Sequence, residues 1–273
     1  MAESNNNLPA LPDYMKKFIQ TTNQDTTAAA SASMSVPRLT IRGKRWRFVE
    51  DGEEELVKDL HVDVVILGVE PGIGKFAKTF YEKTYTSGDK DVPTCSSTNG
   101  VKPDSWVSTP QAPLCANCSK NVFGSATSMS GKKAKACRDS KILWVAKPND
   151  PKKFYGLKTP VMSLKSLSEY GKYVAKNNYP LALVITRLGF DDNSEYAKLT
   201  FEHVGFVSEN KVEDAISVNT ERPWNSVAED FAQIDTDEKL ALPGPQNLGP
   251  QGPAHGPQLT APKESIDKVL GNW

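Results

Sequence analysis

The sequence has few of the features that would place the chain in a membrane or in a disulfide-rich secreted class. Its 273 residues contain no run of 18 or more apolar residues, which excludes a conventional membrane-spanning helix. Residues 1–24 are polar and lack the apolar segment of a secretory signal. We therefore expect a soluble protein of the cytoplasm, where its four cysteines act as thiols or metal ligands rather than disulfides.

The residue patterns of common enzyme active sites are also missing. No Ser/His/Asp signature stands out, and Asp191 and Asp192 lie in a predicted turn, where solvation explains them. The segment 68–75 follows an apolar stretch and looks like a phosphate-binding loop. However, Val69 stands where that motif requires glycine, and Phe76 replaces its Ser or Thr. We therefore predict a binding protein and not an enzyme.

Charge is balanced over the whole chain but divided unevenly along it. The formal net charge is zero. Residues 36–158 carry 21 basic and 14 acidic side chains, whereas residues 191–273 carry 6 basic and 15 acidic ones. A basic middle favours a polyanionic partner, although ordinary patchiness of a protein surface explains the same distribution.

Composition divides the chain into a core with a segment of different character at each end. Residues 1–35 are predicted to be a flexible N-terminal arm, and residues 36–218 the folded core, with an insertion at residues 86–140 that has almost no apolar side chains. Residues 219–242 form an acidic segment. Residues 243–273 are rich in proline and glycine, so we expect a disordered tail that ends in a short amphipathic tip.

Apolar spacing predicts the regular elements of the core. Leu164, Leu167, Tyr170 and Val174 recur at helical spacing, so we expect a helix over 163–177. Strands are expected at 38–49 (one or two), 62–69, 141–146, 181–188 and 196–207, with 76–85 as strand or helix and a short helix at 211–218. This order indicates a β-rich α+β fold, and fits an OB-like five-stranded barrel with an inserted zinc loop and one main helix. Another α+β sheet is also compatible.

The four cysteines lie together in the insertion, at Cys95, Cys115, Cys118 and Cys137. A Cys-x-x-Cys turn presents two thiolates to one ion, and two further thiolates complete a tetrahedral zinc site. Metal binding would supply folding energy that this apolar-poor segment lacks. Four sulfur ligands leave no open position, so the zinc is predicted to be structural. Unliganded or redox-active thiols, an iron–sulfur site and a disulfide remain as alternatives.

Basic residues are interleaved with aromatic ones in two parts of the core. Residues 120–158 carry ten Lys or Arg side chains and two acidic ones. Phosphates attract such cations, and unpaired bases stack on flat rings. Phe123 and Trp106, inside the cysteine segment, can act in the same way. The candidate nucleic-acid contacts are Arg42, Lys44, Arg45, Trp46, Arg47, Lys120, Lys132, Lys133, Lys135, Arg138 and Trp144. The alternative is that the rings pack in the core and the lysines keep the surface soluble.

The runs 115–125 and 131–138, with 95–100 before them, resemble a motif of bacteriophage single-stranded DNA-binding proteins. The resemblance implies zinc ligation by all four cysteines and DNA contact through the barrel and its basic neighbours. It also implies a role in DNA replication or recombination in the cytoplasm of the infected host cell. Two alternative functions stay open, a zinc-stabilised structural or adaptor protein and a zinc-ribbon transcription modulator.

The end of the chain is a candidate site for a protein partner. Proteins of the family that the motif resembles often end in a short acidic, hydrophobic tip that recruits replication partners. Here the corresponding apolar residues are Ile266, Val269, Leu270 and Trp273, and the tip is only mildly acidic. The resemblance implies that replication or recombination proteins bind these four residues.

Overall fold

The computed structural model describes residues 36–82, 92–128, 131–194 and 197–233. The predicted N-terminal arm (1–35), the Pro/Gly-rich tail (243–273) and the partner-binding tip lie outside the described residues. None of the helices within the described ranges has the length and apolarity needed to span a bilayer.

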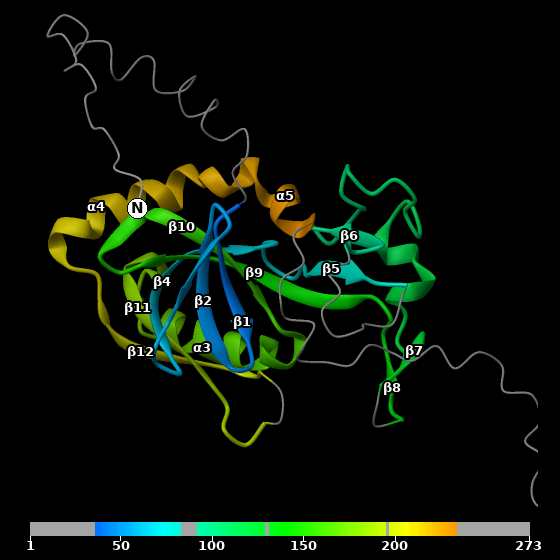
Figure 1. Ribbon diagram of the computed structural model, residues 1–273, viewed down its shortest axis with the longest axis horizontal. Helices are drawn as coiled ribbons and strands as arrows, with labels where there is room; N and C mark the ends of the chain where they lie inside the picture. Colours follow the sequence, from blue (N-terminus) through cyan, green and yellow to red (C-terminus); the bar gives the residue numbers. More distant parts are fainter. Residues whose placement is uncertain (1–35, 83–91, 129–130, 195–196, 234–273) are drawn as a thin grey trace, which may run out of the picture.

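A curled sheet of ten strands forms the body of the protein (Figure 1). Its main path runs β12-β11-β4-β9-β10-β1-β2-β3, and β5 joins β9 to β6 at one side. The strands are β1 (Arg38–Arg42), β2 (Arg45–Glu50), β3 (Glu53–Leu56), β4 (Val62–Glu70), β5 (Ala77–Phe80), β6 (Cys95–Ser97), β9 (Arg138–Lys147), β10 (Asp150–Thr159), β11 (Val184–Phe190) and β12 (Leu199–Phe206). Neighbouring strands are antiparallel, except that β1 pairs with β10 in parallel.

Helices are few and short beside this sheet. Within the described residues, the α-helices are α3 (Leu164–Lys176), α4 (Glu209–Glu221) and α5 (Ala228–Gln233). Single 3-10 turns are η2 (Cys115–Asn117), η3 (Ser119–Asn121), η4 (Val161–Ser163), η5 (Leu181–Leu183) and η6 (Pro223–Ser226). A separate two-stranded ribbon consists of β7 (Ala126–Thr127) and β8 (Lys133–Ala134). The prediction of a β-rich α+β fold is confirmed, and the sheet has more strands than the five predicted.

Most predicted elements are present close to their expected positions. The helix α3 has Tyr170 and Val174 buried, as its spacing predicts. The strands β11 and β12 form the expected hairpin. The stretch 38–49 is two strands, because Gly43 and Lys44 both adopt positive φ (57° and 53°) and reverse the chain. Strands β3, β6, β7, β8 and β10 were not predicted.

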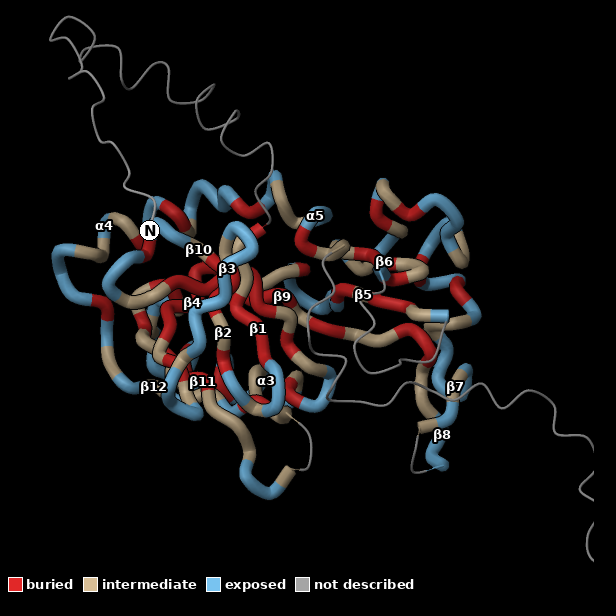
Figure 2. Tube along the Cα trace, in the orientation of Figure 1, coloured by how far each residue is buried: buried red, intermediate tan, exposed pale blue. Residues whose placement is uncertain are grey.

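Two layers of buried side chains cover the two faces of the sheet. The concave face holds a core that includes Leu39, Trp46 and Tyr170, the last from α3. The opposite face packs against α4, η6 and α5 through Ala215, Trp224 and Phe231. Figure 2 shows the buried residues concentrated in the central strands β1, β4 and β9.

The core continues beyond the boundary predicted at Val218. Trp224 has no exposed surface and stacks on Trp144 with ring centroids 5.8 Å apart. Gly156 makes room for Phe231, because a Cβ there would lie 2.5 Å from its ring. The predicted acidic segment 219–242 therefore begins with residues that complete the core, up to α5.

Candidate metal and nucleic-acid site

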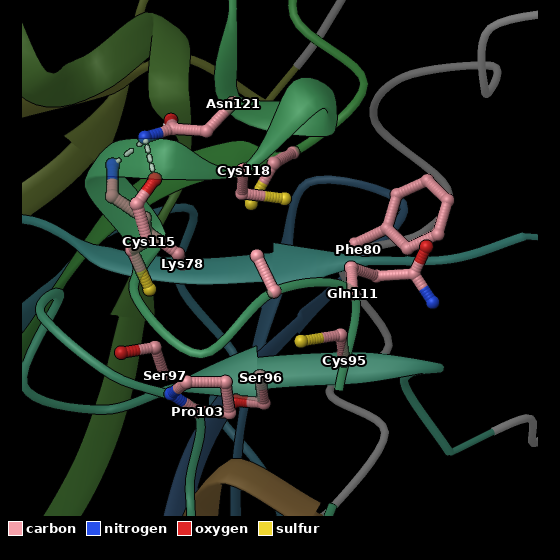
Figure 3. A pocket seen from close by; sticks show the side chains of 12 residues that line it. Lys78, Phe80, Cys95, Ser96, Ser97, Pro103, Gln111, Cys115, Cys118 and Asn121 are labelled. Carbon is pink, nitrogen blue, oxygen red and sulfur yellow. Dashed lines mark hydrogen bonds between the residues drawn. The ribbon is translucent and has the colours of Figure 1, made fainter. Parts of the chain in front are cut away.

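The four cysteines line one small cavity of about 20 Å³. Cys95 opens β6, Cys115 lies in η2, Cys118 separates η2 from η3, and Cys137 directly precedes β9. Figure 3 shows Cys95 on one side of the pocket and the Cys115–Cys118 turn on the other. All four are free thiols, and all but Cys95 are buried. The sequence therefore identified four residues that meet in space, although 42 positions separate the first from the last.

Hydrogen bonds to backbone carbonyls hold the cysteine segments together, because the described part of these segments has no large apolar core. The Asn121 side-chain amide donates to the carbonyl of Cys115 (2.8 Å), which fixes the Cys-x-x-Cys turn. The amide of Cys137 donates to the carbonyl of Lys120 (2.8 Å). Phe80, Ala136 and Cys137 form a separate small apolar cluster. This cysteine module, the described residues between 92 and 137, is thus held together by polar contacts and one small apolar cluster.

Burial favours the protonated form of two of the thiols, Cys137 and Cys95. It raises the pKa of Cys137 to about 12, against the opposing charge of Lys78. Burial also raises the pKa of Cys95. A bound cation reverses this preference, because a coordinating thiol is deprotonated.

The donor set and the cavity size suit a four-sulfur zinc site, since a cavity of about 20 Å³ has room for one small ion. Among the described residues, however, no three His, Cys, Asp or Glu side chains lie close enough to form a ligand group. The sulfur atoms thus share a cavity without being drawn together around its centre. Zinc ligation by these four residues stays a prediction.

Two lysines, an aspartate and an asparagine form a hydrogen-bond network that joins the cysteine module to strands β5 and β9. Asp139 accepts hydrogen bonds from Lys78 (2.7 Å) and Lys135 (2.5 Å). Both ammonium groups also donate to the side-chain oxygen of Asn121, at 3.2 and 3.1 Å. Burial opposes ionisation of Asp139, but the two lysines outweigh it and lower its pKa. Lys135, predicted to contact DNA, is therefore held in an internal network, and Lys78 is a member that sequence reasoning missed.

The two tryptophans that we predicted to contact DNA are core residues, and we correct that part of the prediction. Trp46 and Trp144 have no exposed surface. Trp46 stacks on Phe190 at 4.9 Å and donates its indole N–H to the carbonyl of Leu60 (3.1 Å). A ring enclosed on both faces cannot stack on a base.

The basic strip of β1 and β2 lies at the surface and contacts neighbouring backbone and acidic groups. Lys44 donates to the carbonyl of Ser194 (2.7 Å), and Arg45 to that of Lys58 (2.9 Å). Arg47 and Arg42 lie 3.4 and 3.9 Å from carboxylate oxygens of Glu54. Arg42 and Arg45 are exposed and remain accessible, because exposed ion pairs exchange readily, whereas Lys44 and Arg47 are half-buried.

The most exposed aromatic ring near predicted DNA contacts is Phe123, at 72% exposure. The amide of Gly124 donates to the carbonyl of Ala134 (2.9 Å), and a Cβ at Gly124 would lie 3.8 Å from the Lys133 side chain, so Phe123 directly precedes a residue that contacts β8. Figure 1 shows the β7–β8 ribbon extending away from the curled sheet. Lys133 and its neighbour Lys132 are both exposed. An exposed ring and two exposed lysines thus lie in hydrogen-bonded segments of this projecting part of the module.

Two other predicted DNA contacts, in or next to the module, are less accessible than Lys132 and Lys133. Lys120 is half-buried, with its ammonium 5.3 Å from the centroid of the Phe80 ring. Arg138 is half-buried at the start of β9.

The glycine-rich loop at 68–75 has the wrong polarity for phosphate. Carbonyl groups of Pro71 and Gly72 accept hydrogen bonds from the ammonium of Lys141. A phosphate-binding loop would direct N–H groups at its ligand instead. The structure therefore agrees with the rejection of that motif.

No protein-family model matches the chain, and no curated protein or solved structure was found to be similar to it.

Proposed function

We propose that this chain is a single-stranded DNA-binding protein of bacteriophage replication or recombination. The observation that carries the proposal is the exposed ring of Phe123 in the segment that leads into the projecting β7–β8 ribbon, where Lys132 and Lys133 are also exposed. Bases of a single strand have free faces that stack on such a ring, and phosphates neutralise the adjacent lysines. Paired bases in a duplex have no free face to offer.

The curled sheet serves in this proposal as an OB-like barrel. Arg42 and Arg45 lie exposed at the β1–β2 turn and add further cations to the surface. Backbone neutralisation of this kind is independent of base sequence and weakens with salt. The protein would therefore coat exposed strands without selecting a sequence.

Zinc has a structural role in the proposal. Cys95, Cys115, Cys118 and Cys137 would hold the ion, and its charge would stabilise four thiolates in the cavity that they already line. A rigid module would keep Phe123 and its lysines in place. The metal then supports binding without touching DNA.

Replacing Phe123 with alanine tests the carrying observation. We expect the variant to bind a labelled oligothymidylate more weakly by about 1–3 kcal/mol, the usual contribution of one stacked base. Fluorescence anisotropy measures this loss directly. The matched control is Phe206→Ala, since Phe206 is also an exposed phenylalanine (51%) but lies on β12. Unchanged affinity of Phe123→Ala would contradict the proposed contact.

A further inference from the structure

A second hollow lies between the β2–β3 hairpin and the neighbouring strands β9 and β10. Its volume is about 460 Å³. Its lining consists of two rings, two lysines and five acidic side chains of the hairpin: Phe48, Tyr155, Lys147, Lys153, Glu50, Asp51, Glu53, Glu54 and Glu55. This hollow, which we call the hairpin cleft, is far larger than the cysteine cavity, and it contains none of the nucleic-acid contacts predicted from sequence.

The two lysines of the hairpin cleft are each bound by a carboxylate of the hairpin. Lys147 Nζ lies 2.7 Å from Glu55 Oε2, and Lys153 Nζ lies 2.5 Å from Glu50 Oε2. Lys147 also lies over the ring of Phe48, 4.5 Å from its centroid. The hydrogen bond from Lys153 to Glu50 raises the lysine pKa. Each lysine ammonium is thus held in position by an ion pair with a glutamate carboxylate of the hairpin.

The strand that carries Glu55 is weakly attached. All four residues of β3 are exposed, and in the described part of the sheet β3 pairs only with β2. Figure 2 shows β3 as a pale, exposed segment at the sheet edge. Exposed ion pairs contribute little stability, and an edge strand without buried side chains opens at low cost. An opened β3 would carry Glu53, Glu54 and Glu55 away from Lys147 and leave that cation to a polyanion.

We propose that the hairpin cleft is a phosphate-binding part of the single-stranded DNA path, and that Glu50 and Glu55 occupy the phosphate positions until DNA displaces them. This inference rests on the proposed function. Carboxylate and phosphate oxygens accept the same charge-assisted hydrogen bonds from an ammonium group. Phe48 and Tyr155 are 5% and 3% exposed, so they form the floor of the cleft and stack on no base. Recognition here is of the backbone alone.

Neutralising the two hairpin carboxylates is the first arm of the test. We expect the double variant E50Q/E55Q to bind oligothymidylate about fivefold to tenfold more tightly at low salt, because two exposed ion pairs no longer compete. The matched control is E169Q/D192N, which changes net charge equally at exposed positions outside the cleft. Its affinity should rise by less than about twofold, because screened charges act weakly at a distance.

The second arm removes the cations. We expect K147Q/K153Q to lower affinity and to reduce the slope of log affinity against log salt by about 1.4, since two phosphates go unneutralised. Thermal unfolding of the variant verifies that it is folded. Hydrogen exchange supplies a structural readout, in which amides of residues 53–56 should exchange faster when DNA is added to the wild-type chain.

The outcomes separate the two proposals. A wild-type chain that ignores single-stranded DNA overturns the proposed function. The wild-type chain could instead bind DNA while K147Q/K153Q keeps the wild-type salt slope and E50Q/E55Q binds like its control. That result would overturn the cleft proposal alone.

Discussion

Replacing Trp224 with alanine is expected to lower the free energy of unfolding by about 3–5 kcal/mol. Its indole is fully buried and stacks on Trp144, with Phe154 6.0 Å away at its edge. Gly68 of β4 fits against the same ring, since a Cβ there would lie 2.4 Å from it. The small side chain would leave a cavity that this rigid sheet cannot close.

Urea denaturation followed by circular dichroism measures the loss. The control is Phe123→Ala, since that ring is 72% exposed and its removal should change stability by less than about 0.5 kcal/mol. A loss below about 1 kcal/mol for Trp224→Ala would mean that residues beyond Val218 are not part of the core.

Replacing Cys118 with serine is expected to remove the metal and to unfold the cysteine module. We expect about one zinc ion per wild-type chain and almost none in the variant, because three thiolates and a hydroxyl bind zinc far less tightly. The described module has only small apolar clusters, so loss of the ion removes its main source of folding energy. Elemental analysis gives the stoichiometry, and proteolysis within residues 92–137 reports the unfolding.

Ser119→Ala is the control for this change, because the adjacent serine is exposed and does not line the cavity. A wild-type chain that contains no metal and resists proteolysis would contradict the zinc proposal. The four cysteines would then be buried thiols held by the hydrogen bonds already described.

The parts of the fold that sequence reasoning found have strong local patterns. Helix α3 follows from apolar residues at helical spacing, and β4 from the continuous apolar run at its centre. Strand β3 is Glu-Glu-Glu-Leu, a sequence with low strand propensity that is extended because it pairs with β2. Strand β10 begins Asp-Pro-Lys-Lys, so its polar start conceals the buried half that follows.

Side-chain exposure was the property that the sequence could not provide. Trp46 and Trp144 stand among lysines and arginines, and a ring in such a run has the same local pattern whether it faces the core or the solvent. Phe231 lies in an acidic stretch, so local composition assigned it to the acidic segment 219–242 outside the core, whereas packing against Gly156 places it in the core. The cysteine spacing did identify residues that share a cavity, because ligand motifs carry their geometry in the sequence.

Binding of the unmodified chain to DNA tests the central claim most directly. Fluorescence anisotropy with a labelled oligothymidylate and a duplex of equal length, over a salt series, separates base stacking from simple charge attraction. We expect tight binding to the single strand, weak binding to the duplex, and affinity that falls with salt. Equal binding to both, preference for the duplex, or no binding would contradict the claim, and duplex preference would instead favour a transcription modulator.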